Sequence, residues 1–304
     1  MRVFGSYYRE VIMKKKIKKI VINNSSLELF KACPRKFYKK IVLGQQVPED
    51  TLAMRLGSAV HEFIEEVTLN PFQEYSEMLR RIHKNWDLPP YDKGDFPHFA
   101  GICRGYVRRY IKEDGKDLMY PAAIAPDGEI LVEKYLETCI DEKENIWING
   151  TIDRISETES GQIYLFDTKT TSAASFWTQN MNRKAHLTPQ LTHYTYLMMQ
   201  AGLKPDGCVI DLVSTSQHHS VKNHYDRLST TRSDARIASW LAETTYYCKL
   251  IKDCIENETF PRNMGDNCSA FNKPCPYLKS CMNPGDAEQP YAISSPQSFK
   301  VEYE

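Results

Sequence analysis

The chain has 304 residues, of which 41% are hydrophobic, as expected for one large globular domain or one domain with substantial insertions. Its 39 Lys and Arg residues balance 39 Asp and Glu residues, which excludes a global positive field that would hold nucleic acid indiscriminately. No segment approaches the ~18 uninterrupted apolar residues of a membrane helix, and the beginning of the chain lacks the pattern of an export signal. We therefore expect a cytoplasmic protein with no membrane partner.

The first third of the sequence is mostly helical in pattern. A basic leader at residues 1–22 runs into a short predicted strand at 17–23. Ser25 or Ser26 is expected to cap the next helix, because a hydroxyl there can accept the free amides of the first turn. Apolar residues at helical spacing predict a helix at 52–69, and further helical patterns lie at about 74–86 and 97–112. A helical insertion at about 70–125 follows from these patterns.

The middle of the sequence changes to the period of β-strands. Turn signals separate three consecutive predicted strands, which indicate an antiparallel meander. A helix, two more strands and a long helix are expected next, so the chain belongs to the α/β class. The predicted strands are 129–140, 146–156, 162–169, 207–214 and 221–228, and the predicted helices are 189–201 and 233–258.

The main candidate for chemistry is a pair of acids on two adjacent predicted strands. Asp153 lies in Gly-Thr-Ile-Asp-Arg-Ile at 150–155, and Asp167 lies in Asp-Thr-Lys at 167–169. Carboxylates at strand ends can bind Mg²⁺ or Mn²⁺, and the backbone carbonyl of Thr168 could add an oxygen ligand. Strand alternation places Lys169 on the face of Asp167, where a cation can orient water and balance transition-state charge. A surface hairpin with an ordinary ion pair is the alternative.

Three further candidate residues precede or follow this pair of acids along the chain. His61 lies in Gly-Ser-Ala-Val-His at 57–61 and offers an imidazole to a metal. Gln190 and Tyr194 are four residues apart on one predicted helical face, where an amide and a phenol can contact a phosphate or a base together. Each of the three has a structural alternative, and the order of all the motifs along the chain is the specific signal.

In this order, G-x-x-x-H, G-x-x-D-R-I, D-x-K-T and Q-x-x-x-Y resemble the motifs of RecB-like PD-(D/E)XK nucleases over residues 25–285. The resemblance implies a restriction-endonuclease-like core, with a mixed central sheet flanked by helices. It implies that His61, Asp153 and Asp167 bind the metal, and that Lys169 positions or activates the attacking water. Gln190 and Tyr194 would then support the active site and the DNA strand.

The nine cysteines, an odd count in a chain without an export signal, favour reduced thiols or metal ligation over a disulfide framework. Four of them resemble the iron-sulfur ligands of the AddB nuclease and of CRISPR-associated RecB-like exonucleases. They are Cys33 near the start of the chain and Cys268, Cys275 and Cys281 in a Pro-rich tail. The resemblance implies a four-iron four-sulfur cluster that joins the two ends of the nuclease domain, and zinc is the chemical rival because it also accepts four thiolates.

These signals predict one nuclease domain at 23–285, with a helical N-terminal region, a Cys-rich metal-binding segment at 259–285 and a C-terminal tail at 286–304. The predicted activity is Mg²⁺- or Mn²⁺-dependent hydrolysis of DNA, by an exonuclease of phage or mobile-element recombination. A DNA endonuclease of the same fold is the nearest alternative, and a non-catalytic nucleic-acid-binding iron-sulfur scaffold is the rival from another class. A homo-oligomer or a recombination partner protein is a further possibility that the sequence leaves open.

Overall fold

A computed structural model describes residues 16–46, 52–70, 74–84, 95–172, 180–217, 224–269, 273–283, 292–293 and 299–303. The chain folds into two compact units. The terminal unit comprises Met1–Val47, Thr138–Asn149 and Leu241–Glu304, and the central unit comprises Pro48–Glu137 and Gly150–Trp240. Within the described ranges, no helix is long and apolar enough to cross a membrane.

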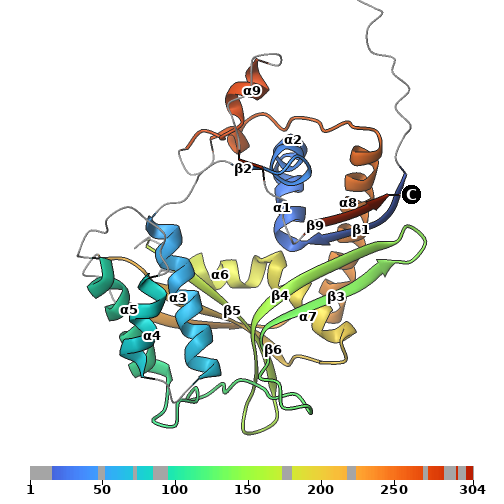
Figure 1. Ribbon diagram of the computed structural model, residues 1–304. Coiled ribbons are helices and arrows are strands. Elements are labelled where there is room, and N and C mark those ends of the chain that lie inside the picture. The colour runs from blue at the N-terminus through green and yellow to red at the C-terminus, as the bar shows by residue number, and fades with distance from the viewer. Residues whose placement is uncertain are drawn as a thin grey trace, which may run out of the picture. The chain divides into compact units, whose positions relative to one another are not determined.

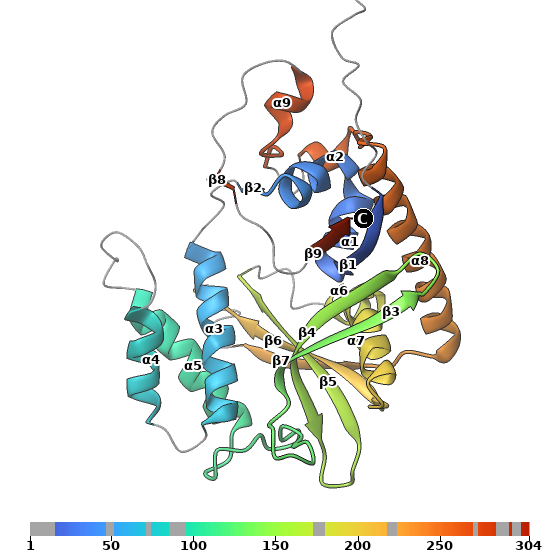
Figure 2. The same cartoon turned by 45° about the vertical axis from the view of Figure 1, so that its right-hand side comes forward.

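The central unit is built on strands β5, β6 and β7 and on the adjoining parts of β3 and β4 (Figures 1 and 2). Antiparallel pairing joins β4 to β5, parallel pairing joins β5 to β6, and antiparallel pairing joins β6 to β7, so this sheet is mixed. Strand β3 pairs with β4. The bounds are β3 Val132–Asp141, β4 Ile146–Glu157, β5 Ile163–Thr171, β6 Gly207–Ser214 and β7 Tyr225–Thr230.

Helices cover both faces of this mixed sheet. Successive side chains of a strand point to opposite faces, and on β6 the side chains of Cys208 and Val213 therefore do so. Cys208 contacts Thr195 of helix α7, whereas Val213 joins the core formed by α3, α4 and α5. Every residue of β6 is buried, as expected for a strand covered on both sides. The helices are α3 Leu52–Leu69, α4 Tyr75–Lys84, α5 Asp95–Tyr110, α6 Asn180–Leu187 and α7 Pro189–Gln200.

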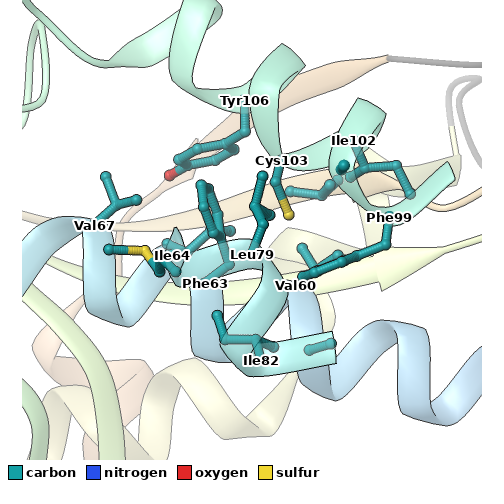
Figure 3. Close-up of a cluster of buried hydrophobic side chains, with 14 of the residues drawn as sticks. Val60, Phe63, Ile64, Val67, Leu79, Ile82, Phe99, Ile102, Cys103 and Tyr106 are labelled. Atoms are coloured by element: carbon teal, nitrogen blue, oxygen red, sulfur yellow. The ribbon is translucent and has the colours of Figure 1, made fainter. Parts of the chain in front are cut away.

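A hydrophobic core of the central unit lies among α3, α4 and α5 (Figure 3). Apolar residues spaced three and four apart along α3 face it, which is the pattern that predicted this helix from the sequence. Phe63, Leu79, Phe99 and Tyr106 are each at most 1% exposed. The core fixes α3 against the sheet, and α3 carries one of the candidate site residues.

The terminal unit combines β1 (Ile17–Asn23), β9 (Phe299–Tyr303) and the first residues of β4. Strand β1 pairs in parallel with β4, Ile20 facing Ile146, and pairs antiparallel with β9. Its described helices are α1 Asn24–Ala32, α2 Pro34–Phe37, a π-helical turn at Tyr38–Val42, most of α8 (Asp234–Glu256), a 3₁₀ turn at Asp266–Cys268 and α9 (Leu278–Met282). Two short strands, β2 (Gln45–Gln46) and β8 (Ala292–Ile293), pair with each other.

Helix α1 corrects one expectation from the sequence. Asn23, and neither Ser25 nor Ser26, caps it, and the side-chain oxygen of Asn23 accepts a hydrogen bond from the amide of Ser26 at 2.8 Å. Asparagine caps helices as well as serine does, and the helix begins as soon as β1 ends, which leaves both serines inside the first turn.

Candidate active site

The β4–β5 hairpin brings the two predicted acids together. Register pairs Arg154 with Phe166, so Asp153 and Asp167 stand opposite each other on adjacent strands. One carboxylate oxygen of Asp153 accepts the amide of Thr168 at 2.7 Å. The Nζ atom of Lys169 donates to Oδ1 of Asp167 at 2.9 Å, which confirms that Lys169 and Asp167 share a face. The Asp167 side chain is only 2% exposed, whereas that of Lys169 is 43% exposed and can reach a substrate.

Helix α3 brings His61 to the same place. A Cβ atom on Gly57 would lie 2.8 Å from Oγ1 of Thr170, so the absence of a side chain lets α3 approach β5 closely. One turn further along the helix, Nδ1 of His61 lies 3.9 Å from Oδ2 of Asp153. The glycine and the histidine of the first motif therefore have linked roles, because the glycine permits the contact that places the histidine.

Helix α7 adds the predicted amide and phenol. The side-chain amide of Gln190 donates to the hydroxyl of Tyr194 at 3.0 Å, so the two residues share a face as predicted. A Cβ atom on Gly150 would lie 2.8 Å from the Tyr194 ring and 3.2 Å from Leu197. The glycine that precedes Asp153 by three residues thus makes room for the tyrosine ring against strand β4.

Burial and mutual repulsion shape the charges of these residues. Burial raises the pKa of Asp167 to about 6, Lys169 partly offsets the shift, and the negative charge of Asp153 adds to it. Burial also raises the pKa of Asp153, against the hydrogen bond from Thr168. The pKa of His61 is lowered, first by burial and then by the charge of Lys169, which favours a neutral imidazole. A neutral imidazole beside two carboxylates is a donor set for a divalent cation.

A sequence model of the PD-(D/E)XK nuclease superfamily matches residues 22–282, most of the chain. The chain belongs to this superfamily. No curated protein matches it. Among solved structures it is similar to a protein described as an exonuclease from Eubacterium rectale, with 12% identity, 97% of each chain covered and a TM-score of 0.49. It is also similar to the protein SSO0001, with 12% identity, 74% of this chain and 75% of that chain covered and a TM-score of 0.33. Neither likeness is close enough to assign a reaction or a substrate.

PD-(D/E)XK nucleases typically use divalent cations such as Mg²⁺ or Mn²⁺, and the chemistry of this site fits one. Oδ2 of Asp167 is buried and has no hydrogen-bond partner, which is costly for a carboxylate unless a cation or a proton satisfies it. Within the described part of the chain, no group of three or more His, Cys, Asp or Glu side chains is arranged to hold a metal ion. The oxygens of both acids instead bond to Lys169 and to the amide of Thr168.

Sequence reasoning missed a buried charge network beside the site. Arg154, which follows Asp153, donates to Asp117 at 3.4 Å, and Arg227 donates to the same aspartate at 2.9 Å. Asp211 accepts from the hydroxyl of Tyr106 at 2.5 Å and from Arg227 at 3.3 Å. One signal in the sequence could have revealed this network, namely an aspartate inside the apolar strand Gly207–Ser214. A buried charge without a partner is energetically costly, so a buried positive partner could have been expected.

A small cavity beside Asp153 was also not foreseen, and we call it the acidic cavity. It contains three acids and one histidine from the central unit. Its lining residues are His61, Ile64, Glu65, Thr68, Val132, Glu133, Asp153, Arg154 and Thr168.

The four predicted cluster cysteines lie together in the terminal unit. Cys33, Cys268, Cys275 and Cys281 all line one small cavity, and all are free thiols. Burial raises the pKa of Cys281, and the neighbouring Cys275 and Cys33 add to this shift. Hydrogen bonds hold the tail in place, because the side-chain amide of Asn263 donates to the carbonyl of Ala32 at 2.9 Å and the backbone amide of Cys275 donates to the carbonyl of Cys268 at 2.8 Å.

The remaining cysteines are absent from this cavity, and three of them behave as small core residues. Cys103, Cys208 and Cys248 are buried, whereas Cys139 and Cys254 are only half-buried. Burial raises the pKa of the thiols of Cys103, Cys208 and Cys248, which makes them poor thiolate ligands.

Proposed function

We propose that this nuclease hydrolyses DNA phosphodiester bonds with Mg²⁺ or Mn²⁺ and acts as an exonuclease. The observation that carries the proposal is the buried Asp167, whose one oxygen bonds to Lys169 while the other has no partner. A buried carboxylate with an unsatisfied oxygen, next to a second carboxylate and a neutral imidazole, favours a hard divalent cation. His61, Asp153, Asp167 and the carbonyl of Thr168 would hold it.

When bound, such a cation supplies a Lewis acid for the phosphate and lowers the pKa of an attached water. Lys169 would orient the attacking water and balance the charge that develops on phosphorus, since its Nζ atom is held by Asp167 and its side chain reaches solvent. His61 would act as a neutral ligand, because its lowered pKa leaves the ring uncharged. Tyr194 and Gln190 would contact the DNA strand through their hydrogen-bonded pair.

A cleavage assay tests this proposal. Linear DNA labelled at the 5′ or the 3′ end and a closed circle would be incubated with the wild type and with Lys169→Ala, in Mg²⁺, in Mn²⁺ or in EDTA. We expect cation-dependent loss of label from linear DNA, an intact circle, and cleavage by the variant that is lowered by about 10²-fold or more. Cleavage of the circle would assign an endonuclease, and cleavage in EDTA or undiminished cleavage by Lys169→Ala would refute the active site. Binding of DNA without any cleavage would favour the scaffold function.

We also propose that Cys33, Cys268, Cys275 and Cys281 bind a structural iron-sulfur cluster, with zinc as the alternative. The support is that all four line one cavity and come from two distant parts of the sequence. Ligation would close a loop of about 250 residues, which restricts the unfolded chain. Anaerobic protein should absorb broadly near ~400 nm. Colourless protein with one equivalent of zinc would assign the zinc site, and metal-free protein with four reactive thiols would refute both.

A further inference from the structure

Glu133 lies near the start of strand β3 and belongs to none of the motifs that marked the active site. Its side chain nevertheless lines the acidic cavity together with His61, Asp153 and Thr168. The cavity therefore joins a third acid to two candidate cation ligands. Glu65 of α3 lines it as well, so the cavity carries three carboxylates.

The backbone holds Glu133 in an uncommon conformation. Its φ is +48°, in the left-handed region that costs a residue with a side chain of order 1–3 kcal/mol. Two other described residues that are not glycine have a positive φ, and both lie where the chain turns or a helix ends. Asn145 lies in the turn between β3 and β4, and Glu258 follows the end of α8. Glu133 lies inside a strand, where alternation without this change of φ would send its side chain elsewhere.

Within the described part of the chain, no Lys or Arg side chain forms an ion pair with the carboxylate of Glu133. No hydrogen bond or ion pair joins it to another described side chain, and Arg154, the basic residue of the cavity lining, bonds to Asp117. Glu133 is exposed to solvent, and the other two acids of the cavity lining, Asp153 and Glu65, carry the same charge. A divalent cation would balance these like charges.

We propose that Glu133 is a further cation-binding residue of this nuclease, whose carboxylate joins that of Asp153 in holding a divalent cation. The inference rests on the proposed metal-dependent function and extends it by one residue. Oxygen ligands from separate strands suit Mg²⁺ and Mn²⁺, which take several carboxylates and waters. The strained backbone is then explained, because it turns this one carboxylate into the cavity.

Calorimetric titration of the full chain with Mn²⁺, after treatment with EDTA and without DNA, tests the role of Glu133. Glu133→Gln keeps the size of the side chain and removes its charge. Glu137→Gln is the matched control, since Glu137 lies on the same strand, outside the lining of the acidic cavity, and accepts from Tyr135 at 2.5 Å. We expect Glu133→Gln to bind Mn²⁺ at least about tenfold more weakly or to lose one equivalent, and the control to match the wild type.

Thermal melting separates cation binding from a structural role. In EDTA the Tm of Glu133→Gln should match or exceed that of the wild type, because a repelled carboxylate is removed, and the rise in Tm caused by Mn²⁺ should shrink. Should Glu133→Gln fail to fold, Glu133→Asp replaces it, with weakened Mn²⁺ binding as the expected result. Mn²⁺ binding equal to that of the wild type would overturn the role of Glu133 alone. A wild type that neither binds Mn²⁺ nor cleaves DNA would overturn the proposed function itself.

Discussion

Replacing Asp167 by Asn should stabilise the metal-free protein while abolishing cleavage. Asp167 is about 1% exposed and its pKa is raised to about 6, mainly by burial. In the folded protein the carboxyl group therefore holds its proton at pH values where the unfolded chain, with a pKa of 3.8, has released it. The contribution of Asp167 to the free energy of unfolding therefore falls as pH rises from about 4 to about 6, and it stays lowered above that range.

The magnitude follows from the two pKa values. The gap between 3.8 and about 6 corresponds to about 3 kcal/mol of lost stability at pH 8. Asn removes this penalty, but its amide nitrogen would stand where Oδ2 now lacks a partner, at a cost of about 1–3 kcal/mol. We therefore expect Asp167→Asn to gain up to about 2 kcal/mol over the wild type at pH 8 and to lose that advantage near pH 4.

Urea unfolding in EDTA at several pH values between about 4 and 8 measures this difference, and it must be reversible at each pH. The control is Asp114→Asn, in an exposed loop, where Asp114 accepts the amide of Lys116 at 3.1 Å and Asn can accept it equally. A stability difference between Asp167→Asn and the wild type that does not change with pH would refute the reasoning. So would an advantage that grows as the pH falls.

Three further predictions concern other parts of the molecule. Lys169→Ala should lower single-turnover cleavage by about 10²-fold or more, and in NMR titrations it should raise the pKa of His61, which Lys169 now lowers; an unmoved His61 would contradict that electrostatic link. Gly150→Ala should cost about 1–3 kcal/mol in urea unfolding, because its Cβ would meet the Tyr194 ring at 2.8 Å. Gly101→Ala on α5, with nothing within 4 Å, should be neutral or stabilising. Anaerobically purified Cys33→Ser should lack the ~400 nm absorption and melt at a lower Tm than the wild type. Cys139→Ser should keep the absorption and the Tm of the wild type, because Cys139 does not line the cavity of the four cluster cysteines.

The sequence predicted those elements whose signal is local. Helix α3 at Leu52–Leu69 and strand β6 at Gly207–Ser214 have the predicted bounds, because each has a strong apolar pattern between clear boundaries. Strand β9 at Phe299–Tyr303 was not foreseen. Its residues alternate between apolar and polar, but the segment is only five residues long, and its partner β1 lies at the other end of the chain. Pairing between distant segments leaves no trace in a local pattern.

The residues of the candidate site also divide into those that a local sequence pattern predicts and those that it does not. Lys169 and Asp167 could be placed on one face from strand alternation, and Gln190 and Tyr194 could be paired from helical spacing, since both periods are fixed by backbone geometry. Glu133 could not be placed in the site from strand alternation, because its φ of +48° breaks the alternation on which such a prediction depends. A sequence pattern predicts regular backbone, and functional residues held by irregular backbone escape it.

The charges of the buried network beside Asp153 bear on the proposal that the active site holds a divalent cation. Arg154 and Arg227 contact Asp117 and Asp211, so two positive charges meet two negative ones. Arg227 also lies over the ring of Tyr110, at 3.7 Å from its centroid, which fixes it further. The positive charge of Arg154 acts to lower the pKa of Asp153, but the cavity lining holds three carboxylates and this one arginine. The charge of Lys169 is directed at Asp167, and the remaining negative charge of Asp153, Glu133 and Glu65 is what a divalent cation would balance.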